Sequence, residues 1–146
     1  MVTFDKTVVI AAPLGEVFDY VSQPAHFPDF LSITDFQFLT DKHRGTDTRV
    51  RYNLICGGKR TLTECTLGTQ SIDKSVEYHT TRGLACKWEF HLAEVEAGTQ
   101  LRWAGEHEVP LNILDKLLGK SESMRQEMEA TIDDGLQKLK EILESR

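Results

Sequence analysis

The side chains that could carry chemistry in this sequence are few and widely spaced. Five histidines and 23 acidic residues are present, yet no HxH, HExxH or histidine-rich cluster gives them the spacing of a metal site. A P-loop, a GxGxxG motif and a GxSxG motif are also missing from the sequence. We therefore expect no metal and no cofactor. The remaining candidates are acid–base and polar groups, namely His107, Tyr52 and Tyr78, with Thr63 or Cys65.

The three cysteines, Cys56, Cys65 and Cys86, form an odd set without a close pair. That spacing is typical neither of a disulfide framework nor of a zinc knuckle. A nucleophilic cysteine would need a neighbouring histidine or positive charge that lowers the thiol pKa, and the sequence does not indicate one. We expect inert strand residues that are buried or half-buried.

Length and charge limit the function classes. The 146 residues, 40% of them hydrophobic, fit one domain spanning 1–146 with a substantial core. A net charge of -6 argues against nucleic acid or an anionic membrane surface as the main partner. No run reaches the length of a membrane span, and the first residues lack the basic-then-apolar order of a signal peptide. We expect a cytoplasmic protein without integral membrane association, either a monomer or a weak homodimer.

Periodicity predicts an α+β fold. Residues 2–11 alternate like a half-buried strand, and 14–21 and 25–31 favour two short helices, the first beginning after Pro13. Six further strands follow between turn residues, and with the first strand they would form a curved, seven-stranded antiparallel sheet. We place the six at 33–42, 46–56, 60–72, 75–82, 84–95 and 99–109.

A long C-terminal helix is predicted over 121–146. Its apolar residues recur at steps of three and four, which is the spacing of one helix face: Met124, Met128, Ile132, Gly135/Leu136, Leu139 and Ile142/Leu143. Such a helix is roughly 35 Å long and can cross a whole sheet. The connector 110–120 should form a short helix ending at Gly119, with Ser121 or Ser123 capping the long helix.

Alternation along the strands predicts which side chains face the long helix. Trp88, Phe90 and Trp103 should point inward together with Val50, Leu54, Val76, Leu92 and Leu101, and the same parity places Tyr52, Tyr78 and His107 inside. His79 and His91 should be exposed. Strand 60–72 is ambiguous, because Thr63 and Cys65 compete with Glu64 for the inner face. A buried Glu64 would be a candidate acid or base, but we favour Glu64 outside, paired with Arg51.

The order strand, two short helices, six strands, long helix resembles the START-like, helix-grip (SRPBCC) superfamily. The stretches VVIAAPLGEVFDYVSQPAHFPDFL and WEFHLAEVEAGTQL and the closing amphipathic helix are similar to its polyketide cyclase/dehydrase and coenzyme-Q-binding-like branch. The resemblance implies a curved sheet that grips the last helix, with a cavity between them for an apolar small molecule. Packing gives the same expectation, since one helix cannot fill a whole concave face.

Two functions are therefore open. The first is non-catalytic binding or carriage of a small hydrophobic ligand, such as a lipid, a quinone or a polyketide-like aromatic. The second is a polyketide cyclase/dehydrase-type enzyme in which His107 and a tyrosine, Tyr52 or Tyr78, move a proton. A third hypothesis, an interaction module, has no support from the acidic charge balance. The predicted cavity residues are Phe27, Phe30, Tyr52, Leu54, Cys65, Tyr78, Trp88, Phe90, Trp103, His107, Leu117, Met124 and Met128.

Overall fold

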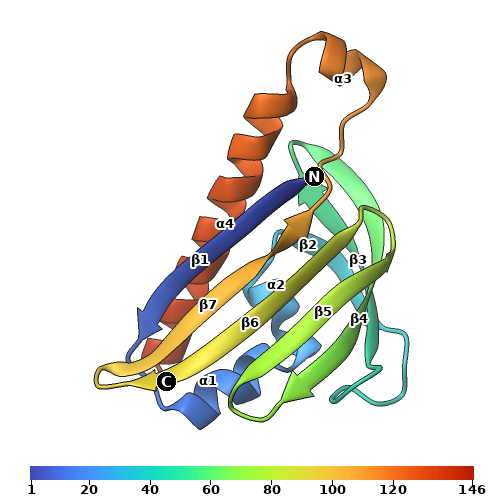
Figure 1. Ribbon diagram of the computed structural model, residues 1–146. Coiled ribbons are helices and arrows are strands. Elements are labelled where there is room, and N and C mark those ends of the chain that lie inside the picture. The colour runs from blue at the N-terminus through green and yellow to red at the C-terminus, as the bar shows by residue number, and fades with distance from the viewer.

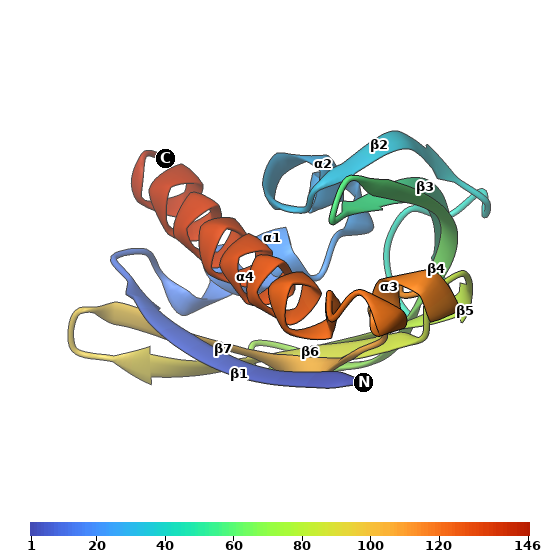
Figure 2. The same cartoon turned by 90° about the horizontal axis from the view of Figure 1, so that it is seen from above.

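A long C-terminal helix lies across the concave face of a single sheet (Figures 1 and 2). The computed structural model describes residues 1–146, apart from the side chain of Ile113. Its elements are β1 (Val2–Ile10), α1 (Leu14–Val21), the 3-10 turn η1 (Pro24–His26), α2 (Phe27–Phe30), β2 (Ile33–Phe38), β3 (Arg49–Cys56), β4 (Lys59–Ser71), β5 (Ser75–Arg82), β6 (Cys86–Val95), β7 (Gly98–His107), α3 (Ile113–Leu117) and α4 (Ser121–Glu144).

The sheet is a seven-stranded antiparallel meander in the order β1-β7-β6-β5-β4-β3-β2. Its strands turn through a wide arc around α4, so that β2 and β3 lie on the opposite side of the helix from β1 and β7 (Figure 2). Register shifts in β4, between Glu64 and Cys65 and between Leu67 and Gln70, accompany this arc. Such bulges bend a strand and increase its twist. The predicted helix-grip fold is confirmed.

The inner faces of the strands follow the predicted parity. Trp88, Phe90, Leu101 and Trp103 are buried together with Val50, Tyr52, Val76 and Tyr78. Cys65 is buried as well, whereas the half-buried Glu64 lies on the outer side, 3.4 Å from Arg51 and 4.0 Å from Arg82. The preferred orientation of strand 60–72 was therefore correct, and it removes Glu64 from the candidate acids.

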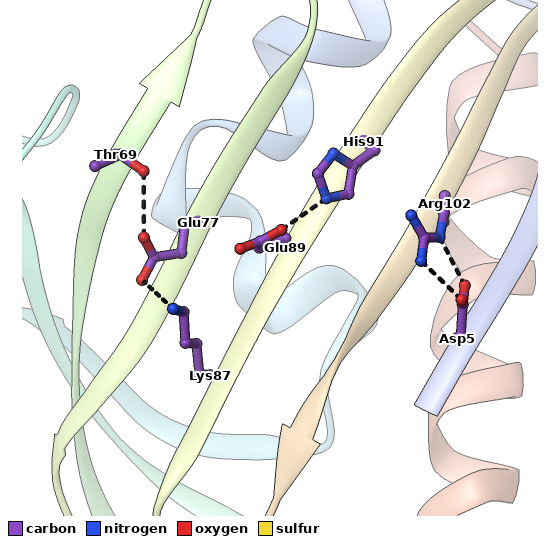
Figure 3. A network of polar contacts seen from close by, with 7 residues as sticks. All are labelled: Asp5, Thr69, Glu77, Lys87, Glu89, His91 and Arg102. Carbon is purple, nitrogen blue, oxygen red and sulfur yellow. Dashed lines mark hydrogen bonds and ion pairs between the residues drawn. The ribbon is translucent and has the colours of Figure 1, made fainter. Parts of the chain in front are cut away.

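The outer face of the sheet is polar and carries paired charges (Figure 3). Arg102 of β7 donates two hydrogen bonds of 2.8 Å to Asp5 of β1, and His91 and Glu89 of β6 lie 2.7 Å apart. Glu77 of β5 accepts from Thr69 at 3.2 Å. Alternation along each strand thus divides the sheet into a solvated convex face and an apolar concave face.

Helix α4 buries one stripe along its 24 residues, at Met124, Met128, Ile132, Gly135, Leu136, Leu139 and Leu143. Helices α1 and α2 pack near its C-terminal half, and α3 lies beyond its N-terminal end (Figure 1). The predicted serine cap was wrong. Lys120 occupies the N-cap position without a side-chain bond, and Ser123 instead donates to the Lys120 carbonyl at 3.0 Å.

Helix α3 is tied to the sheet by a polar contact. Asn112 and Asp115 form a reciprocal capping box at its start, and Asp115 also pairs with Lys59 at the beginning of β4. The short helix predicted in the connector is confirmed, and Gly119 follows it at a φ of 70°. The strand predictions extended too far at β2, β3, β6 and β7, because 39–48 and 108–112 form loops rather than ladder pairs.

Candidate ligand-binding cavity

A cavity lies between the concave face and the N-terminal half of α4. About 60 Å³ of it is available to the centres of water-sized spheres, which is several times what a single water needs. Its walls are largely apolar, and all the strands except β2 contribute. The lining residues are Phe4, Leu31, Ser32, Tyr52, Leu54, Thr63, Thr80, Leu84, Cys86, Trp88, Trp103, His107, Met128, Thr131 and Ile132.

Two tryptophans form the sheet side of this cavity, each stacked on an aromatic neighbour. Trp88 of β6 stacks on Tyr78 with ring centroids 5.3 Å apart, and Trp103 of β7 stacks on Phe90 at 5.3 Å. Phe27 of α2 makes an edge contact with Tyr78 at 5.0 Å. The α2 end of the interior is therefore filled with aromatic rings, and the open space is left toward the α3 end.

The indole N–H groups of Trp88 and Trp103 are buried and have no hydrogen-bond partner among the described residues. An indole nitrogen can only donate, so each group could be satisfied only by an acceptor that is not part of the described protein. Both side chains belong to residues that are only 4% exposed. Buried donors without partners are rare in native structures and indicate a place where something else binds.

His107, at the end of β7, is the acid–base group of the cavity. Its Nδ1 is hydrogen-bonded to the Glu108 carbonyl, which can only accept, so Nδ1 carries the proton. Burial lowers the pKa of His107, and the Glu108 carbonyl and carboxylate oppose that effect. The ring is thus neutral at neutral pH, and its Nε2 is an acceptor for which no bond is found in the described part of the chain.

The two candidate tyrosines lie in different surroundings. Tyr52 lines the cavity, and its pKa is raised well above the usual range, first by burial and then by Cys65 and Cys86. Tyr78 does not line it, because its hydroxyl donates to the Val21 carbonyl at 2.8 Å in the packed interior. Burial likewise raises the thiol pKa of Cys65 and Cys86, the latter to about 12, which keeps both thiols protonated.

The predicted cavity set divides between the lining and its surroundings. Tyr52, Leu54, Trp88, Trp103, His107 and Met128 line the cavity. Phe27, Phe30, Cys65, Tyr78 and Phe90 are buried in the aromatic packing beside it, and Met124 is buried one turn away from Met128. Leu117 is 79% exposed on α3 and does not reach the cavity. The connector has no strand parity from which its direction could be predicted.

Several lining residues were not singled out from the sequence. Phe4, Thr80 and Cys86 have the inward parity of their strands, so alternation could have included them. Leu31, Ser32 and Leu84 lie in connections, for which no periodic signal exists. Thr131 borders the buried stripe of α4 and donates its hydroxyl to the Glu127 carbonyl at 2.9 Å.

Two further searches concern metals and membranes. Over the described residues, no group of three His, Cys, Asp or Glu side chains is placed to hold a metal ion. None of the helices described here combines the length and the apolar character that crossing a bilayer requires.

Known structures share this architecture. The Zhui aromatase/cyclase from Streptomyces sp. R1128 is 18% identical with a TM-score of 0.73, covering 99% of this chain and 94% of that one. A START superfamily protein from Mycobacterium smegmatis gives 14%, 0.72, 98% and 97% for the same quantities. The protein TTHA0849 from Thermus thermophilus gives 17%, 0.75, 96% and 94%. At such identities the likeness concerns the fold.

Sequence comparison gives the family directly. No curated protein sequence matches the chain. The profile of the family described as polyketide cyclase / dehydrase and lipid transport, however, matches residues 1–144. Together with the helix-grip architecture, this match shows that the chain belongs to the polyketide cyclase/dehydrase and lipid transport family of the START-like superfamily.

Proposed function

We propose that this protein binds and carries a small hydrophobic molecule in the cavity between its sheet and α4. The observation that carries the proposal is the cavity itself, whose walls are built mainly of Phe4, Leu54, Trp88, Trp103 and Met128. Burial of apolar surface in such a pocket is the main source of affinity for a small ligand. The family includes lipid transport in its description, which is consistent with carriage.

The acid–base groups give catalysis less support. Tyr78 is committed to the Val21 carbonyl, and the raised pKa of Tyr52 makes its phenolate inaccessible near neutral pH. A proton-transfer mechanism would depend on His107 alone or on His107 with a protonated Tyr52. General acid–base catalysis works best when the pKa of the group lies near the working pH, which Tyr52 does not satisfy.

One specific observation nevertheless favours an enzyme of the cyclase/dehydrase type as the second candidate. His107 lines the cavity as a neutral ring, and its Nε2 is a free acceptor in the described structure. In that reaction Nε2 would take a proton from a methylene or methyl carbon between or beside carbonyl groups. The resulting carbanion would close the ring by an aldol addition, and the loss of water would complete the aromatic product.

The binding proposal is tested by filling the cavity. Met128→Trp adds volume to a lining position, whereas Met124→Trp makes the same change one turn earlier, at a buried position outside the lining. Isothermal titration with tetralin should detect binding to the wild type and to Met124→Trp but not to Met128→Trp. Thermal unfolding checks that both variants are folded. Wild-type affinity in a folded Met128→Trp protein would contradict the location of the site.

The enzymatic candidate needs a separate measurement. The substrate probe is 1-phenylhexane-1,3,5-trione, whose intramolecular aldol closure and dehydration give 5-phenylresorcinol. If His107 is the base, the wild type should form this phenol faster than buffer, and His107→Ala should lose the excess rate while still binding tetralin. Equal rates in the wild type, the variant and buffer would leave carriage as the function of the cavity.

A further inference from the structure

The polar groups of the cavity differ in whether their hydrogens are already used. The Thr63 hydroxyl donates to the Thr61 carbonyl at 3.0 Å, and the Thr80 hydroxyl donates to the Leu84 carbonyl at 2.9 Å. Nδ1 of His107 donates to the Glu108 carbonyl. Ser32 is exposed and can bond to water. These groups have no need of a ligand acceptor.

The indole N–H groups are the exception. Trp88 Nε1 and Trp103 Nε1 are the buried lining donors that lack any partner among the described residues. A buried donor that stays unpaired loses the hydrogen bonds it made to water in the unfolded chain, and nothing replaces them. Both residues belong to the cavity wall, so a bound molecule is well placed to supply the missing acceptors.

The two indoles are close enough to act on one ligand. Trp88 lies on β6 opposite Gly105, and Trp103 precedes Gly105 by two residues on the same face of β7. Inward residues in this diagonal relation have Cα atoms about 7–8 Å apart. Gly105 contributes no side chain between the rings, so the wall there is formed by the two indoles.

We propose that the ligand carries a carbonyl-type oxygen on an apolar ring system, and that the indole N–H groups of Trp88 and Trp103 select it by hydrogen bonding. This inference rests on the proposed binding function and adds the chemical class of the ligand. A hydrocarbon would bury the same apolar surface but leave both N–H groups unpaired. An aryl ketone satisfies at least one of them, and its second lone pair is available to the other.

A matched pair of probes separates the two terms. Tetralin and 1-tetralone share one bicyclic skeleton, and only the ketone has an acceptor. Wild-type protein should bind 1-tetralone about tenfold more tightly than tetralin, which is the effect of one or two net hydrogen bonds. In Trp88→Phe and Trp103→Phe, which keep an aromatic ring without the N–H, this preference should fall roughly three- to tenfold for the residue that bonds the oxygen.

Nuclear magnetic resonance provides a direct reading. The chain has two tryptophans, so its ¹H–¹⁵N spectrum contains two indole signals, and the two phenylalanine variants assign them. Titration with 1-tetralone should move at least one indole proton downfield, as a new hydrogen bond does, whereas tetralin should not. Thermal unfolding of each variant shows whether a lost preference reflects a lost bond or a lost fold.

The outcomes distinguish this inference from the function on which it rests. Equal affinities for the two probes, with indole signals that respond alike to both, would overturn the carbonyl selection and leave hydrophobic binding in place. That result would mean that the rings act only by packing, with N–H groups directed at aromatic faces such as Phe4, whose ring lies edge-on to Trp103 at 5.8 Å. Failure of both probes to bind would overturn the binding proposal itself.

Discussion

Gly135 of α4 lies directly against Trp103 of β7. A Cβ atom at Gly135 would stand 3.3 Å from Cζ3 of the indole and 2.8 Å from the carbonyl oxygen of Phe30. The absence of a side chain therefore lets the long helix approach both the cavity wall and the end of α2. A glycine inside a helix costs about 1 kcal/mol relative to alanine, and this contact gives that cost a structural reason.

Gly135→Ala should consequently destabilise the protein in spite of its better helix propensity. The nearest atom to the new methyl group belongs to the backbone, so α2 or α4 must shift. Overpacking of this kind costs about 1–3 kcal/mol, of which about 1 kcal/mol is offset by propensity. Denaturant unfolding should show a net loss of up to about 2 kcal/mol.

The matched control is Gly15→Ala in α1. A Cβ at Gly15 would meet nothing within 4 Å, so only the propensity term changes. This variant should be neutral or more stable by up to about 1 kcal/mol. Stabilisation of similar size in both variants would show that the helix tolerates a methyl group at Gly135 and that the close approach has no energetic consequence.

Tyr78→Phe should affect stability rather than binding. The lost hydroxyl is buried and donates to the Val21 carbonyl at 2.8 Å, which joins β5 to the end of α1. Leaving that carbonyl unpaired should cost about 1–3 kcal/mol of unfolding free energy. Tyr52→Phe removes a hydroxyl at the cavity instead and should cost less. A larger loss for Tyr52→Phe, or a Tyr78→Phe protein that no longer binds tetralin, would contradict this assignment.

Strand alternation made most of the fold predictable. The side chains of Trp88, Phe90 and Trp103 could be oriented from the sequence because each strand has one buried face, and a slip by one residue would expose all of them. The same rule favoured Cys65 over Glu64 on the inner side. Strand ends were less predictable, since the ladder stops where partner residues run out rather than where apolar residues do.

The extent of the cavity could not be predicted in the same way. Parity states that Tyr78, Phe90 and Phe27 face the interior, but not which of them leave room. Phe27 from α2 fills the space beside Tyr78, and that contact joins residues distant in sequence. The unpaired state of the Trp88 and Trp103 N–H groups also depends on their three-dimensional neighbours, for which a sequence contains no pattern.

The attachment of α3 should depend on one ion pair. Asp115 contacts Lys59 and also caps the helix through the Asn112 N–H at 3.2 Å, and these contacts lower the pKa of the Asp115 carboxyl. Asp115→Asn should weaken the pair, and hydrogen exchange in 111–120 should become faster while β6 and β7 are unchanged. Lys59→Gln should reproduce the effect, and the double variant should add little to either. Additive effects would mean that the two side chains act independently.

His107 should make the protein less stable as the pH falls below neutrality. Because burial lowers the pKa of His107 in the fold, the unfolded chain, with a histidine pKa near 6.5, takes up a proton that the folded protein refuses. The contribution is complete above pH 6.5 and is lost below it, with a slope of at most about 1.4 kcal/mol per pH unit. The lowered carboxyl pKa values of Asp115 and Glu144 act at more acidic pH.

Chemical unfolding of the wild type and His107→Gln between pH 7.5 and pH 5 checks this sign. Glutamine can still donate to the Glu108 carbonyl but does not titrate. The other four histidines are common to both proteins, so their contributions cancel in the difference. The wild type should lose stability relative to the variant as the pH falls. Parallel curves would mean that His107 titrates alike in the folded and unfolded chains, and its neutral state could then not serve either ligand binding or proton transfer.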